Sequence, residues 1–464
     1  MSKLVQLNAT SVSAPPAGGR AAVRPAGRSV YIETYGCQMN INDTEIMAGV
    51  LVGRGYAQVE DPSEADVILV NTCAIREHAE QRVFGRIGHL QQYRRARPDL
   101  VLGVTGCMAQ RLGPELLAET RGVDFVAGPD AYRELGRLVE ELQSGAIERG
   151  QTLLELDASE HYESLPAIRG EGVTAWITVQ RGCDHRCTFC IVPYVRGSEK
   201  NRRPGAILDE VRRAAAAGYT EVTLLGQTVN SYEWDGWGFA SLLSAVAREP
   251  GIRRVRFTSP HPNDVTPDLL DVMAEEPAVC RQLHLPVQSG ADRILKRMVR
   301  RYTVERYHDV VRRVRGQVPG IALSTDVIVG FPGETEEEFE ATLDLMREVR
   351  FDDAYLYRYS KRDGTPATRF PESDFVSDEV AQRRLERLIQ LQRDIQYQIN
   401  RAEVGESREV LVERPARSQG DVLGRTEAAK VVAFAGSSDL IGRYVNVRLT
   451  GTSGATFMGE RVDS

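Results

Sequence analysis

Long hydrophobic runs are absent from the 464-residue sequence: no stretch approaches the roughly 20 apolar residues of a membrane helix. The N-terminal stretch also lacks the apolar segment of a secretory signal, so we expect a cytoplasmic protein with no membrane partner. Positive charge is not in excess either, because the formal net charge is −7. The chain therefore lacks the basic balance of a small nucleic-acid-binding module, although a large enzyme can confine its basic residues to one face.

Cysteine is scarce, with seven residues in the whole chain. In a reducing cytosol, cysteine spacing points to metal binding or catalysis more often than to disulfides. Three of the seven, Cys183, Cys187 and Cys190, lie in the stretch RGCDHRCTFC and are spaced as CxxxCxxC. Zinc and iron–sulfur sites usually take four protein ligands, so a loop with three indicates a metal site that keeps one position open.

The N-terminal part, residues 29–144, alternates short apolar runs with polar helical stretches. This alternation predicts an α/β domain with an open parallel sheet and helices on its faces. The predicted strands are SVYIETYG, DVILVNT, LVLGVTG and VDFVAG. Residues 1–28, which are rich in Ala, Pro, Gly and Arg, are predicted to form a disordered tail.

A cysteine follows each of the first three predicted strands, and these residues are Cys37, Cys73 and Cys107. The carboxyl ends of parallel strands lie at one edge of a sheet, which is where such folds bind ligands. We therefore expect the three thiols to converge on a shared ligand. The alternative is that they are small buried apolar residues, a common fate of free cysteine.

A second series of strands and helices occupies residues 169–401, after a linker expected at residues 144–168. Six predicted strands, AWITVQ, EVTLLG, VRFTS, LHLPV, ALSTDVIVG and AYLYRYS, indicate a partial (β/α)6 TIM-like barrel. Its distinctive loops, CxxxCxxC included, follow the strands, where such barrels carry their chemistry. Residues 402–464 change to short β-branched runs separated by Gly, Ser and Thr, which predicts a small all-β barrel.

The open metal position favours a 4Fe–4S cluster, in which three cysteines hold three irons and leave the fourth without a protein ligand. Such clusters reach potentials as low as roughly −700 mV, so an electron from one can cleave a bound sulfonium, as S-adenosylmethionine chemistry requires. With three cysteines in each of the first two parts, the sequence predicts two clusters. A zinc site is the competing interpretation, and its nearby candidate for a fourth ligand is His185. Cys280 is left over and is expected to be a small buried residue.

Motifs along nearly the whole chain resemble one family. CxxxCxxC followed by IVPYVRGSEKNRR resembles the radical S-adenosylmethionine superfamily, and in particular its methylthiotransferase branch. YGCQMN, NTCAIREHAEQRV and TGCMAQR are similar to the N-terminal domain of that branch, and LLGQTVNSY, FTSPHP, LHLPVQSG and DVIVGFPGET are similar to its barrel. The last part, with GRT at residues 424–426, resembles a TRAM domain, an RNA-binding β-barrel. GCQMN and NTCAIRE are most similar to MiaB-type tRNA methylthiotransferases.

The resemblance implies a transferase that places a methylthio group on C2 of N6-isopentenyladenosine at position 37 of tRNA, using two S-adenosylmethionine molecules. It implies that the CxxxCxxC cysteines hold the radical-generating cluster and that the three strand-end cysteines hold an auxiliary one. The partners would be tRNA, a sulfur donor and a low-potential electron donor such as a ferredoxin or flavodoxin, and a monomer suffices. Threonylcarbamoyl-adenosine in tRNA or a ribosomal protein are alternative substrates. A non-catalytic zinc-bearing RNA-binding protein is the alternative from another class.

The remaining site residues are expected in loops and in the last part of the chain. Glycine lets the backbone approach a ligand closely, so loops after three barrel strands are expected to contact S-adenosylmethionine, although turn geometry alone also accounts for them. These residues are Gly226, Gln227, Ser289, Gly290, Gly330 and Glu334. The basic residues expected to bind RNA are Arg425, Lys430 and Arg448, in a part that is otherwise nearly neutral.

Overall fold

The computed structural model describes residues 27–74, 77–170 and 172–462, so the tail predicted for residues 1–28 lies almost wholly outside the described residues. The chain forms two compact units. The first contains the residues up to Gly170 together with Ile191–Lys200, and the second contains the residues between Gly170 and Ile191 and those from Asn201 onward. The ten residues after the CxxxCxxC loop thus belong to the first unit, which no sequence pattern indicates.

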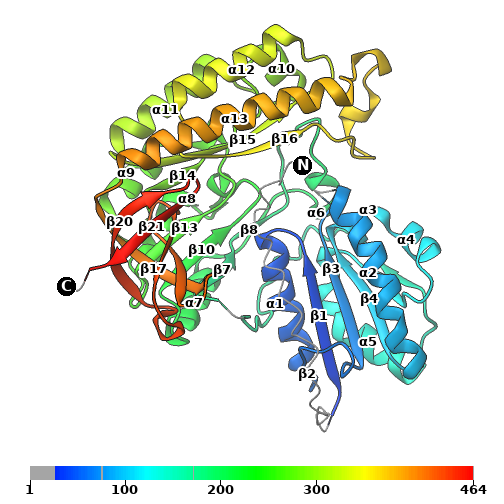
Figure 1. Ribbon diagram of the computed structural model, residues 1–464. Helices are drawn as coiled ribbons and strands as arrows, with labels where there is room; N and C mark the ends of the chain where they lie inside the picture. Colours follow the sequence, from blue (N-terminus) through cyan, green and yellow to red (C-terminus); the bar gives the residue numbers. More distant parts are fainter. Residues whose placement is uncertain (1–26, 75–76, 171, 463–464) are drawn as a thin grey trace. The chain divides into compact units, whose positions relative to one another are not determined.

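A parallel six-stranded sheet is the centre of the first unit, with the strand order β2-β1-β3-β4-β5-β6 (Figure 1). Its strands are β1 (Ser29–Tyr35), β2 (Ala57–Gln58), β3 (Val67–Thr72), β4 (Val101–Gly106), β5 (Phe125–Ala127) and β6 (Gln151–Leu153). The four strands predicted from the sequence are confirmed. The structure differs at residues 144–168, because β6 lies within this expected linker and the Gly128 N–H donates to the Leu153 carbonyl at 2.8 Å.

Hydrophobic residues on both faces make β3 and β4 interior strands. Every residue of each strand is buried, as expected for a parallel sheet covered on both sides. Successive side chains point to opposite faces, so Leu69 belongs to one hydrophobic cluster and Val70 to another. The helices of this unit are α1 (Gln38–Val52), α2 (Glu77–Ala96), α3 (Cys107–Leu112), α4 (Pro114–Glu119), α5 (Leu135–Ser144) and α6 (Val192–Arg196), with the 3-10 turn η1 (Pro129–Glu134).

Six parallel strands form the partial barrel of the second unit, as predicted. They are β7 (Thr174–Thr178), β10 (Glu221–Leu225), β13 (Arg254–Phe257), β14 (Gln282–His284), β15 (Ala322–Val329) and β16 (Asp353–Arg358). The first three form a sheet in the order β13-β10-β7, and the last three form another in the order β14-β15-β16. The Cys280 N–H, just before β14, donates to the Val255 carbonyl at 3.0 Å, so backbone hydrogen bonds connect the two sheets.

Helices alternate with these strands, and the hydroxyl of the residue before the helix caps α9, α11, α12 and α13. The Thr335 hydroxyl accepts the Glu338 N–H at the start of α12, where three acidic residues also suit the positive end of the helix dipole. The helices are α7 (Pro204–Ala216), α8 (Phe239–Ala247), α9 (Pro267–Glu275), α10 (Asp292–Arg297), α11 (Val304–Gln317), α12 (Glu336–Val349) and α13 (Asp378–Ala402). The short elements are β8 (Gln180–Arg181), β9 (Lys200–Asn201), β11 (Glu233–Trp234), β12 (Trp237–Gly238), η2 (Val229–Ser231), η3 (Pro262–Asp264), η4 (Pro366–Arg369) and η5 (Glu372–Asp374).

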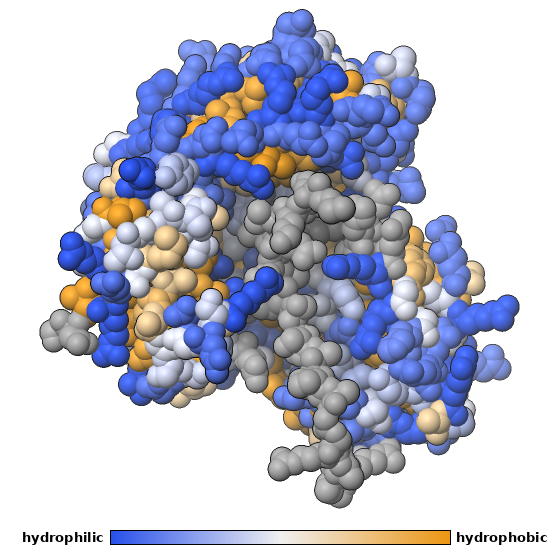
Figure 2. Space-filling view, viewed as in Figure 1, coloured by the Kyte–Doolittle hydropathy of each residue, from blue (hydrophilic) through white to orange (hydrophobic). Residues whose placement is uncertain are grey.

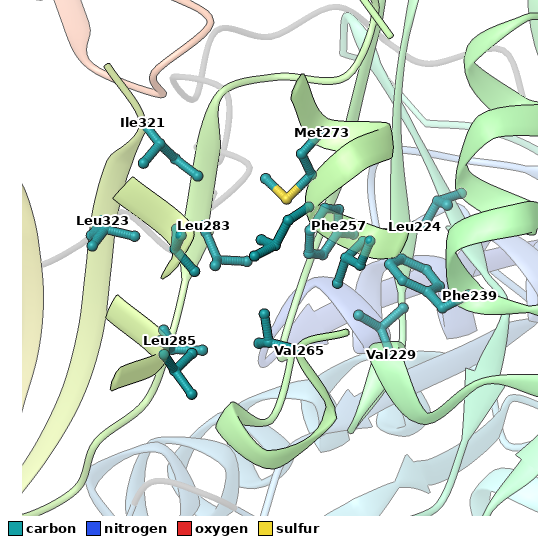
Figure 3. Packing of buried hydrophobic residues seen from close by; sticks show 14 of the residues in the cluster. Leu224, Val229, Phe239, Phe257, Val265, Met273, Leu283, Leu285, Ile321 and Leu323 are labelled. Atoms are coloured by element: carbon teal, nitrogen blue, oxygen red, sulfur yellow. The ribbon is translucent and has the colours of Figure 1, made fainter. Parts of the chain in front are cut away.

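The core of the partial barrel fixes where its strands end. Figure 3 shows Leu224 of β10 and Phe257 of β13 near Phe239 of α8 and Met273 of α9, and all four are buried in one cluster. Burial of each such side chain contributes roughly 1.5–3 kcal/mol. The loops that follow the strands therefore start from rigid positions.

A closed barrel of five strands, in the order β17-β18-β19-β21-β20, forms the C-terminal part of the second unit. The strands are β17 (Ser407–Pro415), β18 (Asp421–Arg425), β19 (Val431–Ala435), β20 (Tyr444–Thr452) and β21 (Thr456–Arg461), with the turn η6 (Ser438–Leu440). Alternating residues such as Val410, Val432 and Phe457 fill its interior. The predicted all-β barrel is confirmed, although the sequence did not indicate β18.

Hydrophilic residues cover most of the visible surface over the long helices α12 and α13 (Figure 2). With 25 residues α13 is long, but its buried residues are interrupted by charged ones throughout. Within the described ranges, no helix combines the length and the apolar character that crossing a bilayer would require.

Candidate functional site

Sheet register brings the three cysteines of the first unit together. The last residues of β1, β3 and β4 are partners across adjacent strands, and Cys37, Cys73 and Cys107 follow them within two residues. A hydrogen bond with Cys73 and the positive charge of Arg196 lower the pKa of the Cys37 thiol to about 6, against the effect of burial. Burial raises the pKa of the Cys107 thiol, and Cys37 acts in the same direction. The predicted convergence is therefore present in the structure.

Cys107 also faces a buried ion pair. Arg196 Nε donates to Cys107 Sγ at 3.2 Å, and Arg196 Nη2 donates to Asp43 Oδ2 at 2.6 Å. Both charged residues are buried, and the hydroxyls of Tyr132 and Tyr162 each donate to Asp43 at 3.4 Å. The segment after the CxxxCxxC loop thus supplies a charged donor to a thiol of the first triad.

The CxxxCxxC loop follows β7 and β8 and is anchored within the second unit. Cys183 Sγ lies 3.2 Å from Thr228 Oγ1, and the Cys190 N–H donates to the Cys187 carbonyl at 3.0 Å, which closes a turn. Between these two cysteines, Thr188 donates both its N–H and its hydroxyl to backbone carbonyls at the end of α10. Cys183 and Cys187 are buried, whereas Cys190 is partly exposed.

Cys187 has a charged donor of its own. Arg300 Nη1 donates to Cys187 Sγ at 3.4 Å, Nε donates to the Tyr302 hydroxyl at 3.0 Å, and Nη2 donates to the Pro286 carbonyl at 3.0 Å. Arg300 is 6% exposed, and its charged or polar neighbours are Tyr302 and Cys187, with no ion pair to a carboxylate in the described part of the chain. A buried charge without a counter-ion is costly, so Arg300 favours an anionic group bound at the CxxxCxxC loop.

The donor set of each triad, three thiols, favours a cluster over a single ion. Among the described residues, His185, His261 and Asp264 form the single group of three possible ligands whose atoms all lie within 4.8 Å of one another. Three thiolates on one zinc ion would also lie this close, because Zn–S bonds are about 2.3 Å long. Neither cysteine triad forms such a group among the described residues, and a 4Fe–4S cluster, which binds each cysteine to a different iron, suits a set of three thiols.

His185, the candidate fourth zinc ligand, is engaged elsewhere. Its Nε2 lies 3.3 Å from Asp264 Oδ2, and its ring stacks on His261 with centroids 3.9 Å apart and an interplanar angle of 13°. An imidazole binds a metal in its ring plane, and two parallel stacked rings have no such plane in common. Burial lowers the pKa of His261 to about 2, so that ring stays neutral.

Left-handed backbone recurs in the loops after β13, β14 and β15, at Ser259 (φ 55°), Gln288 (φ 72°) and Gly330 (φ 69°). For residues other than glycine this conformation costs of order 1–3 kcal/mol, and it clusters at ligand-binding sites. In the loop after β10, the side-chain oxygen of Gln227 is buried with no hydrogen-bond partner among the described residues. A ligand that donates an N–H would satisfy it.

Close packing explains Gly290. A Cβ here would lie 2.5 Å from Thr342 Cα and 2.6 Å from the Ala341 carbonyl oxygen. The Gly290 N–H donates to Thr342 Oγ1 at 2.9 Å, and the neighbouring Ser289 is fully buried. The loop after β14 is therefore fixed against α12.

We expect Gly290→Ala to destabilise the second unit by about 1–3 kcal/mol, the usual cost of overpacking, because the added methyl group meets helix backbone. Gly316→Ala in α11 is the matched control, since a Cβ there meets no heavy atom within 4 Å. Anaerobic thermal unfolding should show a lower melting temperature than that of the wild type for Gly290→Ala. The melting temperature of Gly316→Ala should not be lowered. Equal melting temperatures for the two variants would contradict the packing argument.

The buried Glu334 side chain fixes the loop after β15 by hydrogen bonds. Its Oε2 accepts the Gly330 N–H at 2.7 Å and Arg384 Nη1 at 2.9 Å. Burial raises the pKa of Glu334 to about 7, although the Gly330 N–H and the Arg384 guanidinium act against the shift. The other carboxyl oxygen, Oε1, is buried without a hydrogen-bond partner in the described residues, so it can accept from a ligand.

The three basic residues expected to bind RNA differ in exposure. Arg448 is exposed on β20. Arg425 Nε lies 3.0 Å from Glu413 Oε1, and the Lys430 side chain, which is 9% exposed, pairs with Asp352 at 2.9 Å. Arg448 and Arg425 therefore offer their side chains to solvent, the latter 43% exposed beside Glu413, whereas Lys430 does not.

Two arginines of β13 hold the GRT stretch of the small barrel. Arg256 donates to the carbonyls of Thr426 and Glu427 at 2.8 and 2.7 Å, and Arg254 donates to the Arg425 carbonyl at 2.9 Å. The backbone of this stretch therefore docks the small barrel on the partial barrel. The sequence also does not indicate that Asp43, Arg196 and Arg300 belong to the site, since hydrophobic patterns do not reveal which charged residues are buried.

Three family descriptions match the sequence in order. They are an uncharacterized protein family, UPF0004, at residues 29–128, the radical SAM superfamily at residues 177–346, and the TRAM domain at residues 401–460. The first range contains the strand-end cysteines, the second contains the CxxxCxxC loop, and the third contains nearly the whole small barrel.

Curated relatives match over nearly their whole length. The tRNA-2-methylthio-N(6)-dimethylallyladenosine synthase of Carboxydothermus hydrogenoformans is 45% identical over 433 residues, which cover 92% of this chain and 97% of the relative. The synthase of the same name from Porphyromonas gingivalis is 44% identical over 460 residues, covering 97% and 98%. A solved structure of the radical S-adenosylmethionine methyltransferase TsrM from Kitasatospora setae shares the fold, with a TM-score of 0.56, 15% identity and coverage of 74% and 77%.

The cysteine-bearing parallel sheet, the partial barrel and the TRAM barrel define a sulfur-inserting radical S-adenosylmethionine methylthiotransferase. More narrowly, the chain belongs to the family of tRNA-2-methylthio-N6-dimethylallyladenosine synthases. The predicted fold class is thereby confirmed, as are the enzyme class and the cofactors, two 4Fe–4S clusters and S-adenosylmethionine. The roles of individual residues stay predictions.

Proposed function

We propose that this chain attaches a methylthio group to C2 of N6-dimethylallyladenosine at position 37 of tRNA. The observation that carries the proposal is a pair of three-cysteine sites in a chain that is 45% identical, over 92% of its length, to a synthase of that name. The TRAM match at residues 401–460 supports an RNA substrate. An anticodon loop presents unstacked bases, which proteins read by stacking and by edge contacts.

The six cysteines outside Cys280 are the proposed cluster ligands. Cys183, Cys187 and Cys190 would hold the radical-generating cluster, and Cys37, Cys73 and Cys107 would hold the auxiliary cluster. The C2–H of adenine has no acid–base route to sulfur insertion, and a cluster held by Cys183, Cys187 and Cys190 would supply the electron for reductive cleavage of S-adenosylmethionine. Three thiolates leave one iron of each cluster for a ligand that is not a side chain.

Loop residues of the partial barrel would position S-adenosylmethionine. The proposed contacts are Gly226, Gln227, Ser289, Gly290, Gly330 and Glu334. The buried Oε1 atoms of Gln227 and Glu334, which have no partner among the described residues, are acceptors suited to the ammonium and adenine amino groups of this ligand. The left-handed backbone at Gly330 and its close approach to Ala381, whose Cβ would lie 2.8 Å from an added Cβ, fix the loop that would hold the ligand.

Contacts to tRNA phosphates would come from basic side chains, with Arg448 the best placed and Arg425 and Lys430 partly committed to ion pairs. The reaction also needs a sulfur donor and a low-potential electron donor such as a ferredoxin or flavodoxin. The proposed enzyme acts as a monomer in the cytoplasm, where its tRNA substrate is found.

A bacterial host that lacks its own 2-methylthio modification tests this function. Expression of the chain should restore the methylthio-isopentenyl nucleoside in digested tRNA, as measured by mass spectrometry, and Cys187→Ala should abolish it. Cys280→Ala is the matched control and should restore it like the wild type, because burial raises the pKa of this thiol to about 11 and makes it unreactive.

Other outcomes would point elsewhere. Methylthiolation of threonylcarbamoyl-adenosine or of a ribosomal protein, without the isopentenyl product, would replace the proposed substrate. A colourless anaerobic preparation with zinc and no iron would support a non-catalytic RNA-binding protein instead.

A further inference from the structure

Each cysteine triad has one buried arginine that donates to one of its sulfurs. Arg196 Nε lies 3.2 Å from Cys107 Sγ in the first unit, and Arg300 Nη1 lies 3.4 Å from Cys187 Sγ in the second. The two arginines are 2% and 6% exposed, respectively. A guanidinium is always charged, so each of these sulfurs accepts a charge-assisted hydrogen bond.

The two arginines differ in their counter-charge. Arg196 pairs with Asp43 at 2.6 Å, and Asp43 is itself fully buried. The other hydrogen-bond acceptors of Arg300 are the neutral Tyr302 hydroxyl and Pro286 carbonyl, and no described carboxylate forms an ion pair with it. By these contacts Asp43 offsets part of the arginine charge beside Cys107, whereas no carboxylate offsets the charge beside Cys187 among the described residues.

A buried charge changes how readily a bound cluster accepts an electron. One-electron reduction adds negative charge to the cluster, and an adjacent positive charge in a medium of low dielectric constant favours the reduced form. Hydrogen bonds to ligand sulfurs, net charge and solvent exposure are the protein's means of setting such potentials. A carboxylate paired with the guanidinium has the opposite charge and weakens its effect.

We propose that Arg300 and the Arg196–Asp43 pair are positioning groups that set the order in which the two clusters accept an electron. Arg300 raises the potential of the cluster at the CxxxCxxC loop, and Asp43 withholds the same effect from the auxiliary cluster. One electron from an external donor therefore reduces the site that cleaves S-adenosylmethionine, while the sulfur-holding site stays oxidised. This inference rests on the cluster ligands given under the proposed function.

Two full-length variants isolate one cluster each for the test. The variant Cys37→Ala/Cys73→Ala/Cys107→Ala keeps the radical-generating cluster, and Cys183→Ala/Cys187→Ala/Cys190→Ala keeps the auxiliary cluster. Potentials are measured by anaerobic redox titration followed by electron paramagnetic resonance. In the first background, Arg300→Gln should lower the potential by at least 59 mV, a tenfold shift of a one-electron equilibrium. Arg300→Lys, which keeps the charge, should retain most of the wild-type potential.

In the auxiliary-cluster background the two partners should act in opposite directions. Arg196→Gln should lower the potential, because it leaves the Asp43 carboxylate uncancelled, and Asp43→Asn should raise it, because it releases the charge of Arg196. A purely structural role would not reverse the sign between the two variants. Asp43→Asn is nearly isosteric, so it carries the test even where Arg196→Gln fails to fold.

Cross-controls complete the design: Arg300→Gln in the auxiliary background and Asp43→Asn in the radical background should each leave the potential unchanged. Intact clusters whose potentials do not respond to these variants, or a fall with Asp43→Asn, would overturn this inference while leaving the proposed function in place. Failure of either background to assemble its cluster would overturn the ligand assignment and this inference together.

Discussion

We expect the variant Cys183→Ala/Cys187→Ala/Cys190→Ala to form no 5′-deoxyadenosine and to bind about four irons per chain, against about eight in the wild type. Loss of the thiolates removes the open iron at which S-adenosylmethionine would be cleaved. The remaining irons should stay bound, because the strand-end cysteines lie in a separate compact unit with its own hydrophobic clusters. Iron and sulfide analysis of anaerobically purified protein, with chromatography of the nucleosides, measures both quantities.

The reciprocal variant, Cys37→Ala/Cys73→Ala/Cys107→Ala, should also bind about four irons but keep part of its 5′-deoxyadenosine formation. Its tRNA product should lack the methylthio group, since no second site holds the sulfur. Cys280→Ala is the control in both assays, because it changes a buried cysteine outside both triads. Equal loss of radical formation in both triple variants, with one cluster still bound to each, would contradict the division of labour.

Periodicity and spacing predict the parts of the site that depend on backbone direction. The apolar runs identify β1, β3 and β4, and the rule that parallel strands end at one edge is enough to bring Cys37, Cys73 and Cys107 together. The same reasoning places the CxxxCxxC loop after a barrel strand. In both cases the sequence contains the determinant locally, as a hydrophobic run followed by a cysteine.

The features that the sequence does not reveal depend on contacts between residues that are far apart in the chain. Arg196 and Asp43 are charged residues 153 positions apart, and nothing in either segment shows that they meet in the interior. Lys430 was expected on a surface for the same reason, because a charge is normally solvated, but its side chain is 9% exposed in an ion pair. The edge strand β6 is three residues long, too short for a periodic pattern to show.

Removal of Arg384 is expected to have a large cost in stability. Arg384 Nη1 lies 2.9 Å from Glu334 Oε2 and 3.1 Å from the Glu334 carbonyl, and Nε lies 3.1 Å from Glu336. Arg384→Met would leave Glu334 buried without its counter-charge, and breaking one side of a buried pair costs about 3–5 kcal/mol. For a unit of this size each kcal/mol lowers the melting temperature by roughly 2 °C, which anaerobic thermal unfolding resolves.

A second substitution and the pH dependence show whether the Glu334 charge causes this loss. Glu334→Gln together with Arg384→Met should recover most of the lost stability, because the amide oxygen still accepts the Gly330 N–H and no buried charge remains.

Burial raises the pKa of Glu334 from 4.5 to about 7 in the folded chain, so its stabilising contribution is present below pH 4.5 and is lost as pH rises through 7. Without Arg384 the pKa of Glu334 is higher still. The unfolding free energy of the variant therefore keeps falling above about pH 7, whereas the unfolding free energy of the wild type no longer changes there. The cost of Arg384→Met should therefore be larger at about pH 8 than at about pH 6. An equal cost at both values would mean that lost packing of the arginine stem, rather than an uncompensated carboxylate, destabilises the variant.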